Sequence, residues 1–91
     1  MPRKTYGVQL AASAARSLRK LDRATEVKIA NAIDSLSSDP RPTGCVKLSD
    51  EEAIYRIRVS NYRILYSIAD DVLIVLVIAI GNRREVYRHR K

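Results

Sequence analysis

Cysteine and histidine are almost absent from this chain, which limits how it can be cross-linked or hold a metal. Cys45 is the only cysteine and His89 the only histidine among the 91 residues. One cysteine excludes an internal disulfide, and one residue of each kind is too few for a zinc site of cysteine and histidine ligands. A single hydrophobic core must therefore stabilise the fold without such help.

Long apolar segments are missing as well. The longest apolar run, Val72–Ile80, is far shorter than the roughly 20 residues that span a bilayer as a helix. The N-terminal residues lack the apolar core of a signal peptide. We therefore expect a cytoplasmic protein that does not contact a membrane.

Negative charge is scarce relative to positive charge. The chain has 17 lysines and arginines against 10 aspartates and glutamates, a formal net charge of +7. With 46% hydrophobic and 30% charged residues, its composition is typical of a globular protein, and its length predicts a single domain over residues 1–91. The positive charge favours a polyanionic partner, most simply nucleic acid, although an acidic protein fits the same field.

The clearest local pattern is the segment 55–66, which reads YRIRVSNYRILY. Apolar and polar residues alternate on both sides of Ser60-Asn61, which predicts a β-hairpin that turns there and places Arg58 opposite Arg63. One face then carries Tyr55, Ile57, Val59, Tyr62, Ile64 and Tyr66, and the other carries Arg56, Arg58 and Arg63. Like charges opposite each other on a sheet repel, so we interpret the arginines as a phosphate site, with a merely solvated face as the alternative.

Helical spacing precedes the hairpin. Apolar residues recur at helical spacing over residues 11–21 and again over 27–36. Asp22 is the expected N-cap of the second helix, and Pro40 lies where that helix can no longer continue. The buried stripe of the second helix is predicted to be Val27, Ala30, Ile33 and Leu36. The abrupt joint at residues 21–22 predicts a tight antiparallel helical hairpin.

Strand patterns flank these elements. Residues 6–10 predict a weak edge strand, residues 45–48 a short strand, and Val72–Ile80 a last strand after a two-residue turn at Asp70-Asp71. Because the last strand is apolar on both faces, we expect it inside the sheet. The predicted fold is α+β in the order β-α-α-β-β-β, a mainly antiparallel four-stranded sheet with the helical hairpin on one face. Either the tail after Gly81 or another chain then packs the second face.

The hairpin sequence, the strand ending AIGNRREVY and the preceding helical hairpin together resemble the RelE/ParE toxin superfamily of bacterial type II toxin–antitoxin modules. The resemblance covers nearly the whole chain and is greater to the RelE branch, whose members cleave messenger RNA in the ribosomal A site. It implies the microbial-ribonuclease-like RelE fold and a reaction in which a ribose 2′-OH attacks the adjacent phosphate and expels the 5′-oxygen. It implies no metal ion and no other cofactor.

The same resemblance assigns residues to roles. The implied catalytic residues are Arg56, Arg58, Arg63, Arg83 and Tyr87. Arg63 and a neighbour would clamp the scissile phosphate, Arg83 would face the leaving oxygen, and Tyr87 would stack on a base or orient the ribose. The residues expected to contact RNA or the ribosome are Lys47, Arg84, Arg88, Arg90 and Lys91.

Departures from the family pattern bear on proton transfer. Arg56 and Arg58 occupy positions where relatives often carry lysine, and arginine does not deprotonate near neutral pH. Asn82 stands where relatives often have histidine or another basic residue. The acceptor of the 2′-OH proton therefore stays open among a ribosomal group, Tyr87 and catalysis without a dedicated base.

Three functions stay open on the sequence alone. The leading one is a ribosome-dependent mRNA endonuclease that inhibits translation. A ParE-like toxin, which inhibits DNA gyrase through protein contacts, has the same fold, and a relative without catalysis would bind RNA or only its antitoxin. The expected partners are the ribosome, mRNA and a cognate acidic antitoxin with a helical segment, whose dimerisation would build larger assemblies.

Overall fold

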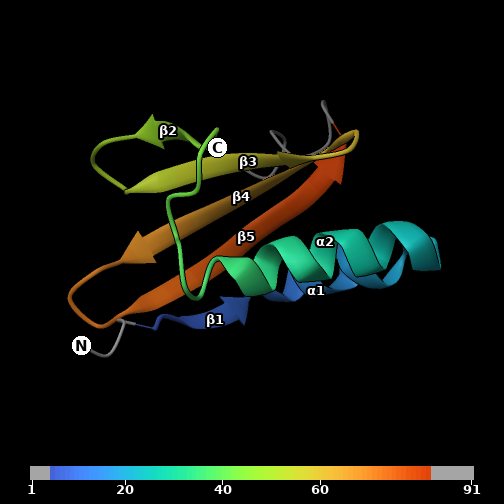
Figure 1. Cartoon of the computed structure of the whole chain (residues 1–91), viewed down its shortest axis with the longest axis horizontal. Coiled ribbons are helices and arrows are strands. Elements are labelled where there is room, and N and C mark those ends of the chain that lie inside the picture. Colours follow the sequence, from blue (N-terminus) through green and yellow to red (C-terminus); the bar gives the residue numbers. More distant parts are fainter. Residues whose placement is uncertain (1–4, 83–91) are drawn as a thin grey trace.

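The computed structural model describes residues 5–82 as two helices and a five-stranded sheet (Figure 1). In chain order the elements are β1 (Gly7–Leu10), α1 (Ala12–Arg19), α2 (Arg23–Ser35), β2 (Val46–Ser49), β3 (Ile54–Val59), β4 (Tyr62–Ala69) and β5 (Ile74–Asn82). The α+β class and the helical pair before a run of strands are confirmed. The four-strand count is wrong, because β1 and the short β2 both join the sheet.

The strand order across the sheet is β1-β5-β4-β3-β2. Neighbours from β2 to β5 are antiparallel, whereas β1 pairs parallel with β5, from Gly7 opposite Ile74 to Leu10 opposite Val77. The apolar β5 therefore lies inside the sheet, as its composition predicts, with β1 as the edge strand beyond it. The turn before β5 is longer than predicted, because Val72 and Leu73 belong to it and Leu73 has a φ of 56°.

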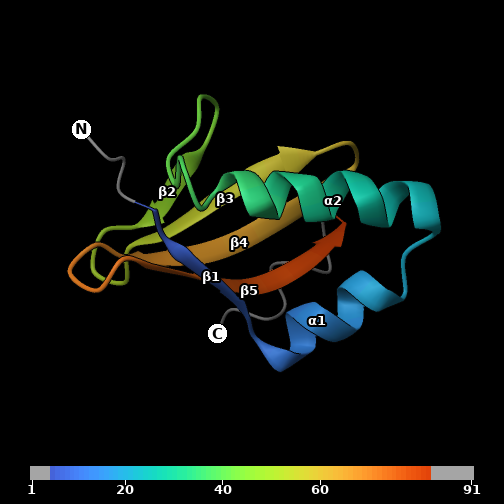
Figure 2. The ribbon, with the colours of Figure 1, turned by 60° about the horizontal axis from the view of Figure 1, so that its bottom comes forward.

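Both helices pack on one face of the sheet, with α1 against β5 and β1 and α2 towards β3 (Figure 2). The buried residues of α2 and its C-cap are Ile29, Ile33 and Leu36, at spacings of four and three. The predicted stripe is wrong at Val27, which is 41% exposed, and it omits Ile29, which is buried in the core. Ala30 is only partly buried. Periodicity alone allowed either stripe, and contact with the sheet selects the one centred on Ile29.

The N-cap of α2 is confirmed. The Asp22 side chain accepts hydrogen bonds from the backbone N–H of Thr25 at 3.1 Å and from its hydroxyl at 2.7 Å. These bonds, the hydroxyl donor foremost, hold the pKa of the Asp22 carboxyl below its usual range. The cap fixes where the second helix begins after the short joint with α1.

A bulge in β5 decides which of its apolar residues face the helices. Leu65 pairs with Ala79 and Tyr66 with Val77, so Ile78 has no direct partner on β4. The extra residue reverses the alternation, so that Val77 and Ile80 both lie in the helix-side core. On the opposite face Leu65 and Ala79 form a small second cluster, against which Leu48 and Ile78 pack.

Candidate functional site

The three arginines of the hairpin lie on the sheet face that the helices leave uncovered. The register of β3 and β4 is the predicted one, with Val59 opposite Tyr62 and Arg58 opposite Arg63, and the turn at Ser60-Asn61 between them. Ser60 adopts a φ of 55°, which a two-residue hairpin turn requires of its first residue. Since side chains alternate along a strand, the arginine face is opposite to the face that packs on the helices.

The arginines differ in exposure. Arg58 is exposed, whereas Arg56 and Arg63 are partly buried. A two-residue turn closes on a hydrogen-bonded pair, so the next pair, Arg58 and Arg63, is of the non-hydrogen-bonded kind, with Cα atoms only about 4.5 Å apart. Two guanidiniums held this close repel, and a bound anion would relieve that repulsion.

The end of β5 lies beside this arginine face. Gly81 pairs with Arg63, and Asn82, the last residue the structure describes, pairs with Tyr62. The other predicted members of the site, Arg83 and Tyr87, lie outside the described residues. So do the predicted RNA-contacting residues Arg84, Arg88, Arg90 and Lys91, as well as His89.

Lys47 is not brought together with the arginines. It pairs with Tyr55 across β2 and β3, and its Nζ lies 5.8 Å from the centroid of the Tyr55 ring and 3.3 Å from Asp50 Oδ1. Tyr55 belongs to the helix-side core. Lys47 therefore lies on the other face of the sheet, and its contact with RNA stays a prediction separate from the arginine face.

A polar cluster around Arg41, which the sequence pattern did not indicate, fixes the loop between α2 and β2. The Arg41 guanidinium donates to both carboxylate oxygens of Asp70, at 3.2 and 2.8 Å, and its Nε donates to the Tyr55 hydroxyl at 3.1 Å. The Tyr6 hydroxyl donates to the same carboxylate at 2.6 Å, and this bond raises the pKa of Tyr6. Residues from four separate segments thus meet at one end of the sheet.

A buried tyrosine completes the anchoring of this loop. Tyr66 is fully buried, and its hydroxyl donates a 2.8 Å hydrogen bond to the backbone oxygen of Pro40. Burial raises the pKa of the Tyr66 phenol, and the neighbouring Cys45 acts in the same direction. Its ring stacks on that of Tyr55, with centroids 5.9 Å apart. The loop is therefore held from the core side as well as by Arg41.

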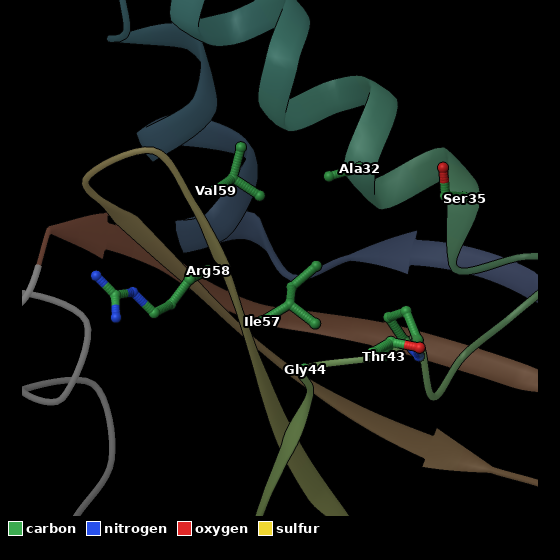
Figure 3. Close-up of a pocket in the computed structure, with 8 residues that line it drawn as sticks. Ala32, Ser35, Thr43, Gly44, Ile57, Arg58 and Val59 are labelled. Atoms are coloured by element: carbon green, nitrogen blue, oxygen red, sulfur yellow. The ribbon is translucent and has the colours of Figure 1, made fainter.

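The anchored loop borders an open groove of about 330 Å³ at the edge of the sheet (Figure 3). Its lining residues are Ala32 and Ser35 of α2, Pro42, Thr43 and Gly44 of the loop, and Ile57, Arg58 and Val59 of β3. Ile57 and Val59 point towards α2, whereas the Arg58 side chain extends away from them. The groove and the arginine face thus meet along β3.

Within residues 5–82, no group of three or more histidine, cysteine, aspartate or glutamate side chains is arranged to hold a metal ion. No helix in this same part of the chain has the length and apolar character needed to cross a membrane. The chemical groups that the described site does offer are guanidiniums on one face of the hairpin and an apolar groove at its edge.

Comparisons with known proteins agree with this architecture. A family model for the ParE toxin of the type II toxin–antitoxin system parDE matches residues 8–87. A putative RelE-like toxin protein from Escherichia coli is 30% identical over 80 residues, which cover 86% of this chain and 83% of that protein.

Solved structures share the fold over most of their length. The match to the RelE–RelB complex of Pyrococcus horikoshii OT3 has a TM-score of 0.80 at 23% identity and covers 89% of this chain and 98% of that one. The match to the toxin–antitoxin complex RelBE2 of Mycobacterium tuberculosis has a TM-score of 0.74 at 25% identity, covering 89% and 94%.

Proposed function

Because this chain belongs to the ParE toxin family of type II toxin–antitoxin systems, within the RelE/ParE superfamily, we propose that it is a toxin that cleaves messenger RNA on the ribosome. The observation that carries this proposal is the set of arginines on the hairpin face that the helices leave uncovered, with Arg58 and Arg63 directly opposite each other. Such crowding is unfavourable for folding and favourable for holding a phosphate.

In the proposed reaction the ribose 2′-oxygen attacks the neighbouring phosphorus and the bond to the 5′-oxygen breaks. The 5′-oxygen leaves with the bonding electrons and takes up a proton from solvent, so the products are a 2′,3′-cyclic phosphate and a free 5′-hydroxyl. Arg58 and Arg63 would hold the phosphate and stabilise the charge that develops on its non-bridging oxygens. Arg56 supports them from the same face, while Arg83 at the leaving oxygen and Tyr87 at the base or ribose come from the family resemblance.

Proton transfer is assigned only in part. Arginine stays charged near neutral pH, so Arg56, Arg58 and Arg63 act electrostatically in this proposal and not as the base. The 2′-OH proton would then go to Tyr87 or to a ribosomal group, or leave without a dedicated acceptor. Dependence on the ribosome follows from this scheme, because ordering of the substrate must supply much of the rate.

The second candidate function is inhibition of DNA gyrase through protein contacts. The matching family model is described as a ParE toxin, and the fold is common to both branches, so it does not separate the two targets. The arginine face favours the nuclease, because a protein that binds gyrase does not need a phosphate clamp. RNA-contacting roles for Lys47, Arg84, Arg88, Arg90 and Lys91 belong to the nuclease proposal.

An acidic antitoxin is the proposed partner that holds the toxin inactive. The similar chain from Mycobacterium tuberculosis was solved as a toxin–antitoxin complex, and this chain carries a net charge of +7. Carboxylates of the antitoxin would neutralise the same arginines that bind RNA. Antitoxin dimerisation would then build larger assemblies.

Primer extension on a defined mRNA in programmed ribosomes tests the nuclease. We expect A-site cuts with a 5′-hydroxyl end for the wild type, and at least a roughly 100-fold slower reaction for Arg63→Ala, as for the loss of one oxyanion donor. Lys28→Ala is the matched control, because Lys28 is exposed on α2, away from the arginine face. Intact mRNA with folded wild-type protein would exclude the nuclease, and inhibition of gyrase supercoiling by the same sample would establish the alternative.

A further inference from the structure

Gly81 lies in the same cross-strand row as the two opposed arginines. It pairs with Arg63 on β4, and Arg63 pairs with Arg58 on β3. Residues directly opposite each other project to the same face of a sheet, so position 81 belongs to the arginine face. A side chain at this position would have its Cβ about 4.5–5.5 Å from the Cβ of Arg63. Glycine places no side chain in that space.

The backbone conformation at Gly81 does not require a glycine. Among the described residues, Gly44 is the only glycine with a positive φ. The pairing of β5 with β4 is regular from Ala79 to Asn82, and the bulge at Ile78 lies before this stretch. A glycine in a regular strand weakens that strand, and it often marks a place where another group approaches closely.

Exposure differs along this row of three residues. Arg58 is exposed, Arg63 is partly buried and Gly81 is buried. The Arg58 side chain extends away from Ile57 and Val59 (Figure 3). Two guanidiniums on opposed residues repel each other, and the repulsion falls when the side chains lean apart. An Arg63 side chain that leans across Gly81 accounts for the burial of both residues.

We infer that Gly81 is a positioning residue for Arg63. It leaves room for the Arg63 side chain to lie across β5, so that the two guanidiniums stand apart and one phosphate fits between them. The role deepens the proposed function and rests on it, because this phosphate is the one at which the RNA is cleaved. A bulkier residue at position 81 would push the Arg63 guanidinium towards Arg58, which raises their repulsion and narrows the space for the phosphate.

A thermal double-mutant cycle tests this contact without RNA. Valine favours strands more than glycine does, so Gly81→Val should raise the Tm in the Arg63→Ala background, where no guanidinium needs the space. In the otherwise wild-type chain, the same change should raise the Tm by at least about 3 °C less, or lower it.

Gly7→Val is the matched control for the cycle. Gly7 is an exposed glycine of β1, and a Cβ there would meet only the Leu73 backbone oxygen, at 3.9 Å. Its change to valine should therefore shift the Tm equally in the wild-type and Arg63→Ala backgrounds. Equal shifts for Gly81→Val as well would overturn the positioning role.

Single-turnover cleavage of mRNA on programmed ribosomes gives the second measurement. Because Arg63 acts on charge that develops in the transition state, Gly81→Val should slow the maximal rate at least about tenfold. The toxin concentration that gives half the maximal rate should stay within about twofold of the wild-type value. Gly7→Val should cut at the wild-type rate. Gly81→Ala should show the same two effects at smaller size, and it replaces the valine variant if that variant does not fold.

A wild-type cleavage rate in folded Gly81→Val would overturn the inference. So would an unchanged maximal rate with weaker binding to the ribosome, which would assign position 81 to binding instead. If the wild-type protein does not cut mRNA, the proposed nuclease fails. The thermal cycle then still decides whether Gly81 makes room for Arg63.

Discussion

The two faces of the β3–β4 hairpin carry opposite kinds of side chain on the same backbone. Towards the helices, Ile64 and Tyr66 are fully buried. One residue away along the strands, Arg58 is exposed and Arg63 partly exposed. The helix-side face therefore supplies most of the burial that stabilises the sheet, whereas the other face, apart from the buried Leu65, carries charges that repel one another.

The largest expected effect comes from truncating a buried side chain on the helix-side face. Ile64→Ala removes a fully buried side chain and should lower the free energy of unfolding by about 2–5 kcal/mol. Arg63→Ala, one position away on the other face, should change it by less than about 1 kcal/mol. Urea denaturation followed by circular dichroism measures both. Equal losses in the two variants would contradict the division between the faces.

A smaller effect is expected from the hydrogen bond that the fully buried Tyr66 makes on the helix-side face. Tyr66→Phe removes the hydrogen bond to the Pro40 oxygen and should cost about 1–2 kcal/mol in the free energy of unfolding. Chemical denaturation at pH 8 provides the measurement, and Tyr62→Phe, at a partly buried position of the same strand, is the control. A loss no greater than that of the control would contradict the anchoring of the loop by Tyr66.

The Tyr66 hydroxyl also predicts a pH dependence. Burial raises its pKa above the ordinary value of 10.0, so above that pH the unfolded chain loses the phenol proton while the folded chain keeps it. Its contribution is fully present below about pH 10 and is lost as the pH rises through the folded pKa. The unfolding free energy, measured from pH 8 to 11, should therefore fall less steeply for Tyr66→Phe than for the wild type. Parallel curves would contradict the burial of this hydroxyl.

The smallest expected effect comes from removing one charge from the arginine face. Arg58→Gln removes the like-charge pair with Arg63 and should raise the free energy of unfolding by about 0.2–1 kcal/mol at low salt. Salt screens such repulsion, so the gain should shrink at about 1 M salt. The same variant should cleave mRNA more slowly. Lys28→Gln, which removes one charge from α2, should show neither change, and a similar gain there would attribute the effect to net charge alone.

Elements that follow a local sequence pattern were predictable from sequence. Features that depend on contacts with distant parts of the chain were not. Alternation over 55–66 predicted the hairpin, its turn and the Arg58–Arg63 pair, and Asp22 was recognised as a cap from its position before a helical pattern. The choice of Ile29 over Val27 for the core depends on where the sheet lies against α2. The bulge at Ile78 changes which residues of β5 face the helices. Because this part of the sequence is uniformly apolar, no pattern in it indicates where the bulge lies.

The candidate site shows the same limit. The alternation of the sequence predicted that the arginines of the hairpin share one face of the sheet. It gave no sign of the Arg41 cluster, whose members Tyr6, Tyr55 and Asp70 come from separate segments. Nor did it indicate that the pairing of β2 with β3 stops at Val46 opposite Arg56.

By itself, the sequence determined which residues share a face of each helix and strand, and so the arginine face, because side-chain direction follows from the period of the backbone. Tertiary structure alone decided the parallel β1–β5 pairing and the groove beside β3. These features depend on contacts between residues far apart in the chain, where the free energy of packing the whole molecule, and not any local pattern, selects the arrangement.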